Sequence, residues 1–128
     1  MAKKRLFLSY DYYNDRHLPG SLVRQAKDPK SPFSIVDVSL KETQPDDKWV
    51  SEAQRKIQRC DFFVVLLGQK THQAPGVLRE VGIARGLKKK RFQLRPKGKR
   101  NIDNKPVPDA GEVIPWKWEN IYTELNKK

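Results

Sequence analysis

Six consecutive apolar residues, 62–67, form the longest uninterrupted hydrophobic run of the 128-residue chain, and the run ends at Gly68. A short run without polar alternation is typical of a central strand that is buried on both faces, as strands of parallel sheets are. It is far too short to cross a membrane as a helix. The run therefore predicts a sheet covered on both sides, which requires amphipathic helices elsewhere in the chain.

The remaining sequence alternates strand and helix patterns around this run. Further strand patterns occupy residues 5–10, 33–38, 90–94 and 113–114, and the weak pattern at 90–94 indicates a position near an edge. Apolar residues recur at helical spacing over 18–26, 49–60, 77–87 and 118–125. This alternation predicts one α/β domain over residues 1–128, with a flavodoxin-like three-layer fold and a mainly parallel sheet of roughly five strands.

Functional loops of such a sheet lie at the carboxyl ends of its strands. Here these ends are residues 9–15, 37–41 and 68–76. They contain no glycine-rich phosphate-binding motif. A phosphorelay receiver would need an aspartate at the end of the central strand, where this chain has Gly68 and Gln69. Two histidines and one cysteine are too few to indicate a metal site, and we expect none.

Glu80 is the most suggestive polar residue near these loops. It falls about one turn into the helix expected after the central strand, beside loop 68–76. A carboxylate at this point can reach into the crevice and act on a bound ligand. The alternative is a solvent-exposed helical glutamate that pairs with Arg79 or Arg85.

Three segments together resemble the TIR-like family typified by bacterial Thoeris antiphage defence proteins. They are LFLSYDYYND at 6–15, PFSIVDVS at 32–39 followed by Trp49, and VLLGQKTH at 65–72 leading to Glu80. They occur in the order and spacing of the family and cover about the first 90 residues. The last part of the chain is only loosely similar, chiefly at VIPWKW, residues 113–118.

The resemblance implies a TIR fold and cleavage of NAD between nicotinamide and ribose. The product would be ADP-ribose or a cyclic ADP-ribose-type messenger in bacterial antiphage signalling. Glu80 matches the glutamate that engages the nicotinamide ribose in catalytic TIR domains. A carboxylate there can hold ribose hydroxyls and offset the positive charge of an oxocarbenium-like transition state. NAD would be a substrate, with no further cofactor, and homotypic association between TIR-like domains is expected.

The same carry-over predicts a set of substrate-binding residues, namely Ser9, Tyr10, Asp11, Asp37, Ser39 and Trp49. Trp49 is either an aromatic wall of the pocket or a buried anchor of its helix. The chain departs from many catalytic relatives at Gly76, where they have a tryptophan, and at Arg79, where some have an aromatic residue. A non-catalytic TIR-like scaffold for protein interaction is therefore the alternative function.

Basic residues give the chain a formal net charge of +12, and they are unevenly distributed. The segment KKKRFQLRPKGKR, from Lys88 to Arg100, contains eight basic residues and no acid. Such a cluster either attracts nucleic acid or an anionic surface, or is a solvated helix end and loop. Without this segment and the basic termini, the chain is close to neutral. The apolar leader of a secreted protein is absent, so we expect a cytoplasmic protein with no membrane partner.

Overall fold

The computed structural model describes residues 3–39 and 46–127, and its centre is a five-stranded parallel sheet with strand order β2-β1-β3-β4-β5. The strands are β1 (Lys4–Ser9), β2 (Phe33–Val38), β3 (Phe62–Leu66), β4 (Lys90–Arg95) and β5 (Glu112–Pro115). The helices are α1 (Gly20–Ala26), α2 (Asp46–Gln58), α3 (Pro75–Gly86) and α4 (Trp118–Leu125). Two short 3-10 helices that the sequence pattern does not predict are η1 (Thr71–Gln73) and η2 (Lys99–Asn101). The predicted α/β fold is confirmed.

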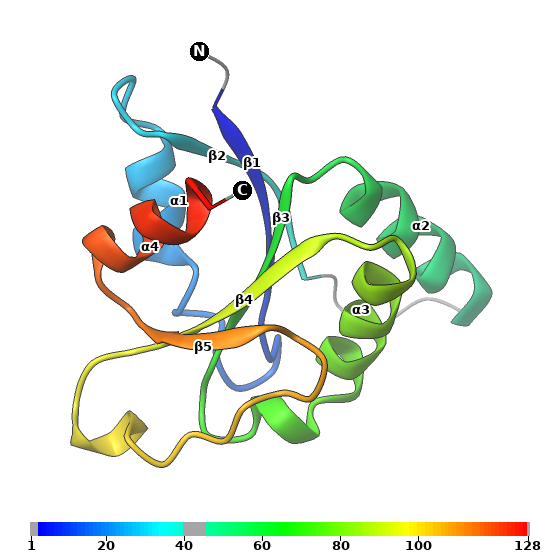
Figure 1. Cartoon of the computed structure of the whole chain (residues 1–128). Coiled ribbons are helices and arrows are strands. Elements are labelled where there is room, and N and C mark those ends of the chain that lie inside the picture. The colour runs from blue at the N-terminus through cyan, green and yellow to red at the C-terminus, as the bar shows by residue number, and fades with distance from the viewer. Residues whose placement is uncertain (1–2, 40–45, 128) are drawn as a thin grey trace.

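Helices cover both faces of the sheet, with α1 and α4 on one face and α2 and α3 on the other (Figure 1). The side chains of β3 alternate between the two hydrophobic cores: Phe62, Val64 and Leu66 pack on one side, Phe63 and Val65 on the other. All five are at most 4% exposed. The uninterrupted apolar run is therefore a consequence of burial on both faces, as predicted.

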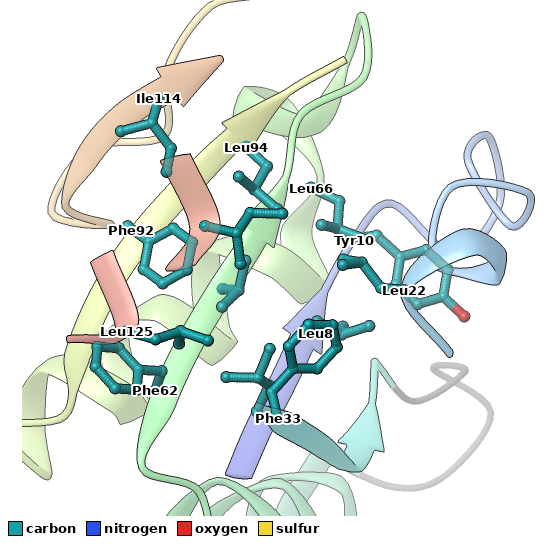
Figure 2. Close-up of a cluster of buried hydrophobic side chains, with 13 residues drawn as sticks. Leu8, Tyr10, Leu22, Phe33, Phe62, Leu66, Phe92, Leu94, Ile114 and Leu125 are labelled. Atoms are coloured by element: carbon teal, nitrogen blue, oxygen red, sulfur yellow. The ribbon is translucent and has the colours of Figure 1, made fainter. Parts of the chain in front are cut away.

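The core beneath α1 and α4 is rich in phenylalanine. Figure 2 shows Phe33, Phe62 and Phe92 from three strands facing Leu22 of α1 and Leu125 of α4. The rings of Phe62 and Phe92 meet edge to face with centroids 6.0 Å apart. Burying one such side chain stabilises the fold by about 1.5–3 kcal/mol. The two cores thus make the sheet a firm support for the loops at its carboxyl edge.

A buried glutamine fixes the long connection between β4 and β5. Gln93 is 1% exposed, its Nε2 donates to the carbonyls of Val107 and Gly111 at 3.0 and 2.8 Å, and its Oε1 accepts from Val107 N at 2.8 Å. Gly111 has φ +89°, and a Cβ at this position would collide with the carbonyl of Arg91. The connection therefore needs a glycine there and lies firmly against the sheet.

The carboxyl ends of β1, β2 and β3 lie at one edge of the sheet, because the strands are parallel. Leu40 and Lys41, the last part of the expected loop 37–41, lie outside the described residues. Among the residues that are described, no helix is long and apolar enough to cross a membrane.

Candidate active site

A narrow cleft opens at the carboxyl ends of β1 and β2, beside the start of α3. Its water-accessible volume is about 40 Å³, room for about three water molecules. The loop after β1 and the first turns of α3 supply most of its lining: Tyr10, Asp11, Tyr12, Tyr13, Ser39, Ala74, Pro75, Gly76, Val77 and Glu80. Only one end of a nucleotide fits inside a cleft of this size.

Glu80 lines this cleft although it is only 1% exposed. The hydroxyl of Ser9 donates a hydrogen bond to Oε1 at 2.7 Å, and the hydroxyl of Ser39 donates to the same oxygen at 2.6 Å. Three parts of the fold therefore meet at one carboxylate: the last residue of β1, the residue after β2 and the second turn of α3. Its burial contradicts the interpretation of Glu80 as a solvent-exposed helical residue.

The helical spacing of α3 explains why Glu80 is buried. Val77 and Ala84 pack into the core beneath α2 and α3, and Glu80 lies on the same helical face, three residues after Val77 and four before Ala84. Proline at position 75 begins the helix, a position where its missing N–H has no cost. The packing of this face therefore directs the carboxylate toward the sheet edge.

Ser39 joins the sheet to the site. Its backbone N–H donates to the carbonyl of Leu8 at 2.9 Å, which extends the β1–β2 ladder one residue past Val38. Its hydroxyl accepts from the backbone N–H of Tyr10 at 2.9 Å while donating to Glu80. A serine hydroxyl can accept and donate at once, so this residue fixes the glutamate and the loop after β1 together.

Asp11 shapes that loop. It is 5% exposed, Oδ1 accepts from the backbone N–H groups of Tyr13 and Asn14 at 3.2 and 3.4 Å, and Oδ2 accepts from the Asn14 side chain at 2.7 Å. An aspartate that binds the backbone two or three residues onward is a common turn device. The Asp11 carboxylate thus supports the wall of the cleft from within.

Three tyrosines form an aromatic wall. The rings of Tyr10 and Tyr12 are stacked with centroids 6.4 Å apart, and Tyr12 and Tyr13 meet edge to face at 5.6 Å. Burial, and next the neighbouring Tyr12 and Glu80, raise the pKa of Tyr10, so its phenol stays neutral at physiological pH. Tyr13 is 59% exposed. Of these three tyrosines, only Tyr10 was predicted from the sequence. The presence of two more tyrosines in a polar loop could have indicated the rest of the wall.

Two of the predicted substrate-binding residues lie elsewhere. The carboxylate of Asp37 pairs with Lys56 of α2 at 3.3 Å. Trp49 is 1% exposed in the core beneath α2 and α3, with the guanidinium of Arg79 4.4 Å from its ring centre. Trp49 is therefore the buried helix anchor of the two interpretations. The other predicted residues are brought together at the cleft: Ser9, Tyr10, Asp11, Ser39 and Glu80.

The basic run does not form one continuous patch. It begins with Lys88 after α3, extends through β4, and ends with Arg100 in η2. Its two ends are thus separated by about 20 Å of strand. Lys89 donates to the carbonyls of Gln58 and Cys60 at the end of α2, and Arg91 donates to that of Asp109. Part of the run therefore stabilises helix and loop ends.

Asp15 links the loop after β1 to the loop after β3. It is 8% exposed, and its Oδ2 accepts a hydrogen bond from the hydroxyl of Thr71 at 3.4 Å. A Cβ on Gly68 would overlap the Asp15 carboxylate, so only glycine leaves room for it. Burial, and next the charge of Asp11, raise the pKa of Asp15.

We expect Asp15→Asn to be more stable than the wild type at pH 7. Because the folded protein raises the pKa of Asp15, it holds this proton more tightly than the unfolded chain does. The ionised carboxylate therefore lowers the free energy of unfolding by its full amount above the pKa of the folded state. This loss disappears below about pH 4, the usual aspartate value. Thermal unfolding between pH 3 and 7 should show a difference in melting temperature between Asp15→Asn and the wild type, and this gap should narrow on acidification. Asp103→Asn, an exposed control, should show none, and a pH-independent gap for Asp15→Asn would contradict this account.

The cleft combines a buried carboxylate, two hydroxyls that orient it, and a wall of aromatic rings. A carboxylate can accept hydrogen bonds from the hydroxyls of a sugar and stabilise a neighbouring positive charge. Tyrosine rings stack on planar groups. Within residues 3–39 and 46–127, no three histidine, cysteine, aspartate or glutamate side chains gather as they would around a metal ion.

Comparison with known proteins identifies a similar fold. No protein-family model matches the sequence, and no curated protein matches it. Among solved structures, the CMP N-glycosidase BcmB of Clostridium botulinum is similar with a TM-score of 0.56 and 18% sequence identity, over 95% of this chain and 97% of that one. At this identity the likeness concerns the fold alone. The chain thus shares its α/β three-layer architecture with a nucleotide glycosidase.

Proposed function

We propose that this protein cleaves the N-glycosidic bond between ribose and base in a nucleotide, and that its substrate is NAD. The observation that carries the proposal is the buried Glu80, held by Ser9 and Ser39 in a cleft with an aromatic wall. The fold shared with a CMP N-glycosidase supports glycosidic cleavage. The motifs similar to Thoeris TIR-like proteins support NAD as substrate and antiphage signalling as the setting.

Apart from the substrate and a water molecule, the proposed reaction uses the Glu80 carboxylate, which Ser9 and Ser39 hold. The bond between C1′ of ribose and the nicotinamide nitrogen breaks, and its electron pair leaves with the nicotinamide. Positive charge develops on C1′ and the ring oxygen, where the Glu80 carboxylate stabilises it. Water then attacks C1′ and loses a proton to solvent, which gives ADP-ribose. Attack by a nitrogen of the substrate's own adenine would give a cyclic product instead.

A nucleoside monophosphate such as CMP is the second candidate, favoured by the likeness to BcmB over most of the chain. Its base is uncharged and must be protonated to leave easily, whereas the nicotinamide of NAD already carries positive charge. In the described part of the cleft, the Asp11 carboxylate accepts three hydrogen bonds, and its raised pKa makes the phenol of Tyr10 a weaker acid. This chemistry favours NAD.

The scaffold alternative fits the site less well. Burying a carboxylate costs free energy, and a protein that only binds partners gains nothing from a glutamate that is 1% exposed beside an open cleft. Homotypic association of TIR-like domains is compatible with catalysis, because a second copy can extend a cleft that holds only one end of the substrate. Self-association is therefore part of the proposal.

The test is to incubate the purified protein with NAD or CMP over a range of protein concentrations that promotes self-association. Released base is measured by chromatography and the sugar product by mass spectrometry. We expect nicotinamide with ADP-ribose or a cyclic isomer. Release of cytosine alone would replace NAD by the second candidate. If neither base is released at any concentration, the glycosidase proposal is wrong.

Tyr13 is expected to stack on the base. Replacing Tyr13 by alanine should raise KM for NAD about tenfold, because base stacking on an aromatic ring contributes about 1–3 kcal/mol, while kcat changes little. Tyr13→Phe keeps the ring and should retain the wild-type KM. Initial rates of nicotinamide release give both constants. An unchanged KM in the alanine variant would remove Tyr13 from the substrate site.

A further inference from the structure

A second and larger hollow lies at the same edge of the sheet. Its water-accessible volume is about 480 Å³, against about 40 Å³ for the cleft at Glu80. Residues of the segments 14–18, 68–70 and 100–101 bound it. The cleft is lined by residues 10–13 of the same loop after β1. The two cavities therefore share one loop, and a single extended ligand can contact both.

Two cationic side chains from separate loops line this hollow, Lys70 and Arg100, and the imidazole of His17 lies beside them. In the described part of the chain, none of the three side chains forms a hydrogen bond or an ion pair. Lys89 and Arg91 differ from them, because both donate to backbone carbonyls. Lys70 and Arg100 therefore carry charges without ion-pair partners at a concave surface, and such charges create a positive potential that attracts anions.

The rest of the lining cancels only part of this potential. Asp15 is the one carboxylate among the described lining residues; it is 8% exposed and accepts a hydrogen bond from Thr71. The side-chain amide of Gln69 adds a neutral donor, whereas those of Asn14 and Asn101 already donate to Asp11 and to the carbonyl of Lys97. A guanidinium, an ammonium and several N–H donors are the groups that bind phosphate oxygens, through charge-assisted hydrogen bonds.

We propose that this hollow binds the phosphate groups of a nucleotide through Lys70 and Arg100. In its stronger form the inference rests on the proposed function: the phosphates belong to the substrate whose ribose reaches Glu80. The pyrophosphate of NAD is attached to the 5′ carbon of that ribose, next to the reacting sugar. Binding it outside the narrow cleft explains how the small cleft at Glu80 accepts one end of a large molecule.

Binding is tested first without any reaction. The isotope-labelled protein is titrated with inorganic pyrophosphate at constant ionic strength and followed by amide NMR. We expect saturable shifts at residues 68–70 and 100–101, and at least tenfold weaker binding by the double variant Lys70→Glu/Arg100→Glu.

The matched control is Lys97→Glu/Lys117→Glu, which makes the same charge change at two exposed lysines of a different hollow. This control should bind pyrophosphate as the wild type does. The absence of saturable shifts in the wild type, or equal weakening in the two double variants, would overturn the proposal.

Activity then tests the source of the phosphate. KM for NAD should rise about tenfold in Lys70→Glu/Arg100→Glu, and KM for nicotinamide riboside, which lacks phosphate, should not change. If pyrophosphate binding is lost and KM for NAD is unchanged, the hollow binds a separate phosphorylated ligand and the substrate assignment is wrong. If the protein cleaves no nucleotide, the NMR titration still decides the phosphate site, so its failure and that of the glycosidase proposal are distinguishable.

Discussion

Replacing Glu80 by glutamine is expected to lower kcat for NAD cleavage about a hundredfold to a thousandfold, the effect of removing a group that stabilises transition-state charge. The amide has nearly the same shape, and its oxygen can still accept hydrogen bonds from Ser9 and Ser39, which both donate to Oε1. The negative charge beside C1′ is lost while the cleft keeps its form. Nicotinamide release under saturating NAD measures kcat, and circular dichroism verifies the fold.

The matched control for this variant is Glu119→Gln, which removes one negative charge from an exposed residue of α4. Its kcat should equal that of the wild type, because Glu119 does not line the cleft. A Glu80→Gln protein that is folded and retains more than about a tenth of the wild-type kcat would contradict a catalytic role for this carboxylate.

Much of the fold could be predicted because burial imposes a simple pattern on β3. Residues 62–67 are apolar throughout since alternate side chains enter different cores. The pattern of β4 is weaker because it contains Gln93, yet β4 lies between β3 and β5 instead of at an edge. Gln93 is fully buried and pairs with the following connection. The hydrogen-bond partners of Gln93 lie 14 and 18 residues later in the chain. From one sequence, a buried polar residue with such distant partners cannot be distinguished from an exposed polar residue.

The site was only partly predictable, and Asp37 shows why. It lies two residues before Ser39, about 6.6 Å back along the strand. At that depth the neighbouring helix is α2, and Asp37 pairs with its Lys56. A shift of register between β1 and β2 at Leu6 and Phe7 also determines which residue of β2 reaches the edge. Such a bulge leaves no clear mark in the sequence.

The sequence indicates that Glu80 is buried, but nothing in it indicates that the basic residues around the larger hollow lie close together. Val77 and Ala84, three residues before and four after it, already place the glutamate on the apolar face of its helix. His17, Lys70 and Arg100, in contrast, are more than 80 residues apart at their extremes. Their loops meet because β1, β3 and β4 are adjacent in the sheet, which is a property of the topology and not of any local segment.

Removing both serine hydroxyls is expected to lower kcat about a hundredfold, as judged from the loss of oriented hydrogen bonds in other active sites. Ser9→Ala and Ser39→Ala should each cost only about threefold to fivefold. Because both donate to Oε1 of Glu80, one serine still orients the carboxylate when the other is absent. The loss in the double variant should then exceed the product of the single losses. Initial rates at saturating NAD give the four kcat values of this double-mutant cycle.

The two single variants should also differ in stability, which separates positioning of Glu80 from support of the fold. Ser39 accepts from the backbone N–H of Tyr10, so Ser39→Ala leaves a buried donor without its partner and costs about 1–3 kcal/mol of unfolding free energy. Ser9→Ala should lower kcat with a smaller loss of stability, since it removes the hydrogen bond to Glu80 and leaves the acceptor of the Tyr10 N–H in place. Ser34→Ala, which removes a serine hydroxyl from β2 at a residue that does not line the cleft, is the control for both measurements. If Ser9→Ala keeps the wild-type kcat, the orientation of Glu80 by this hydroxyl has no role in the reaction.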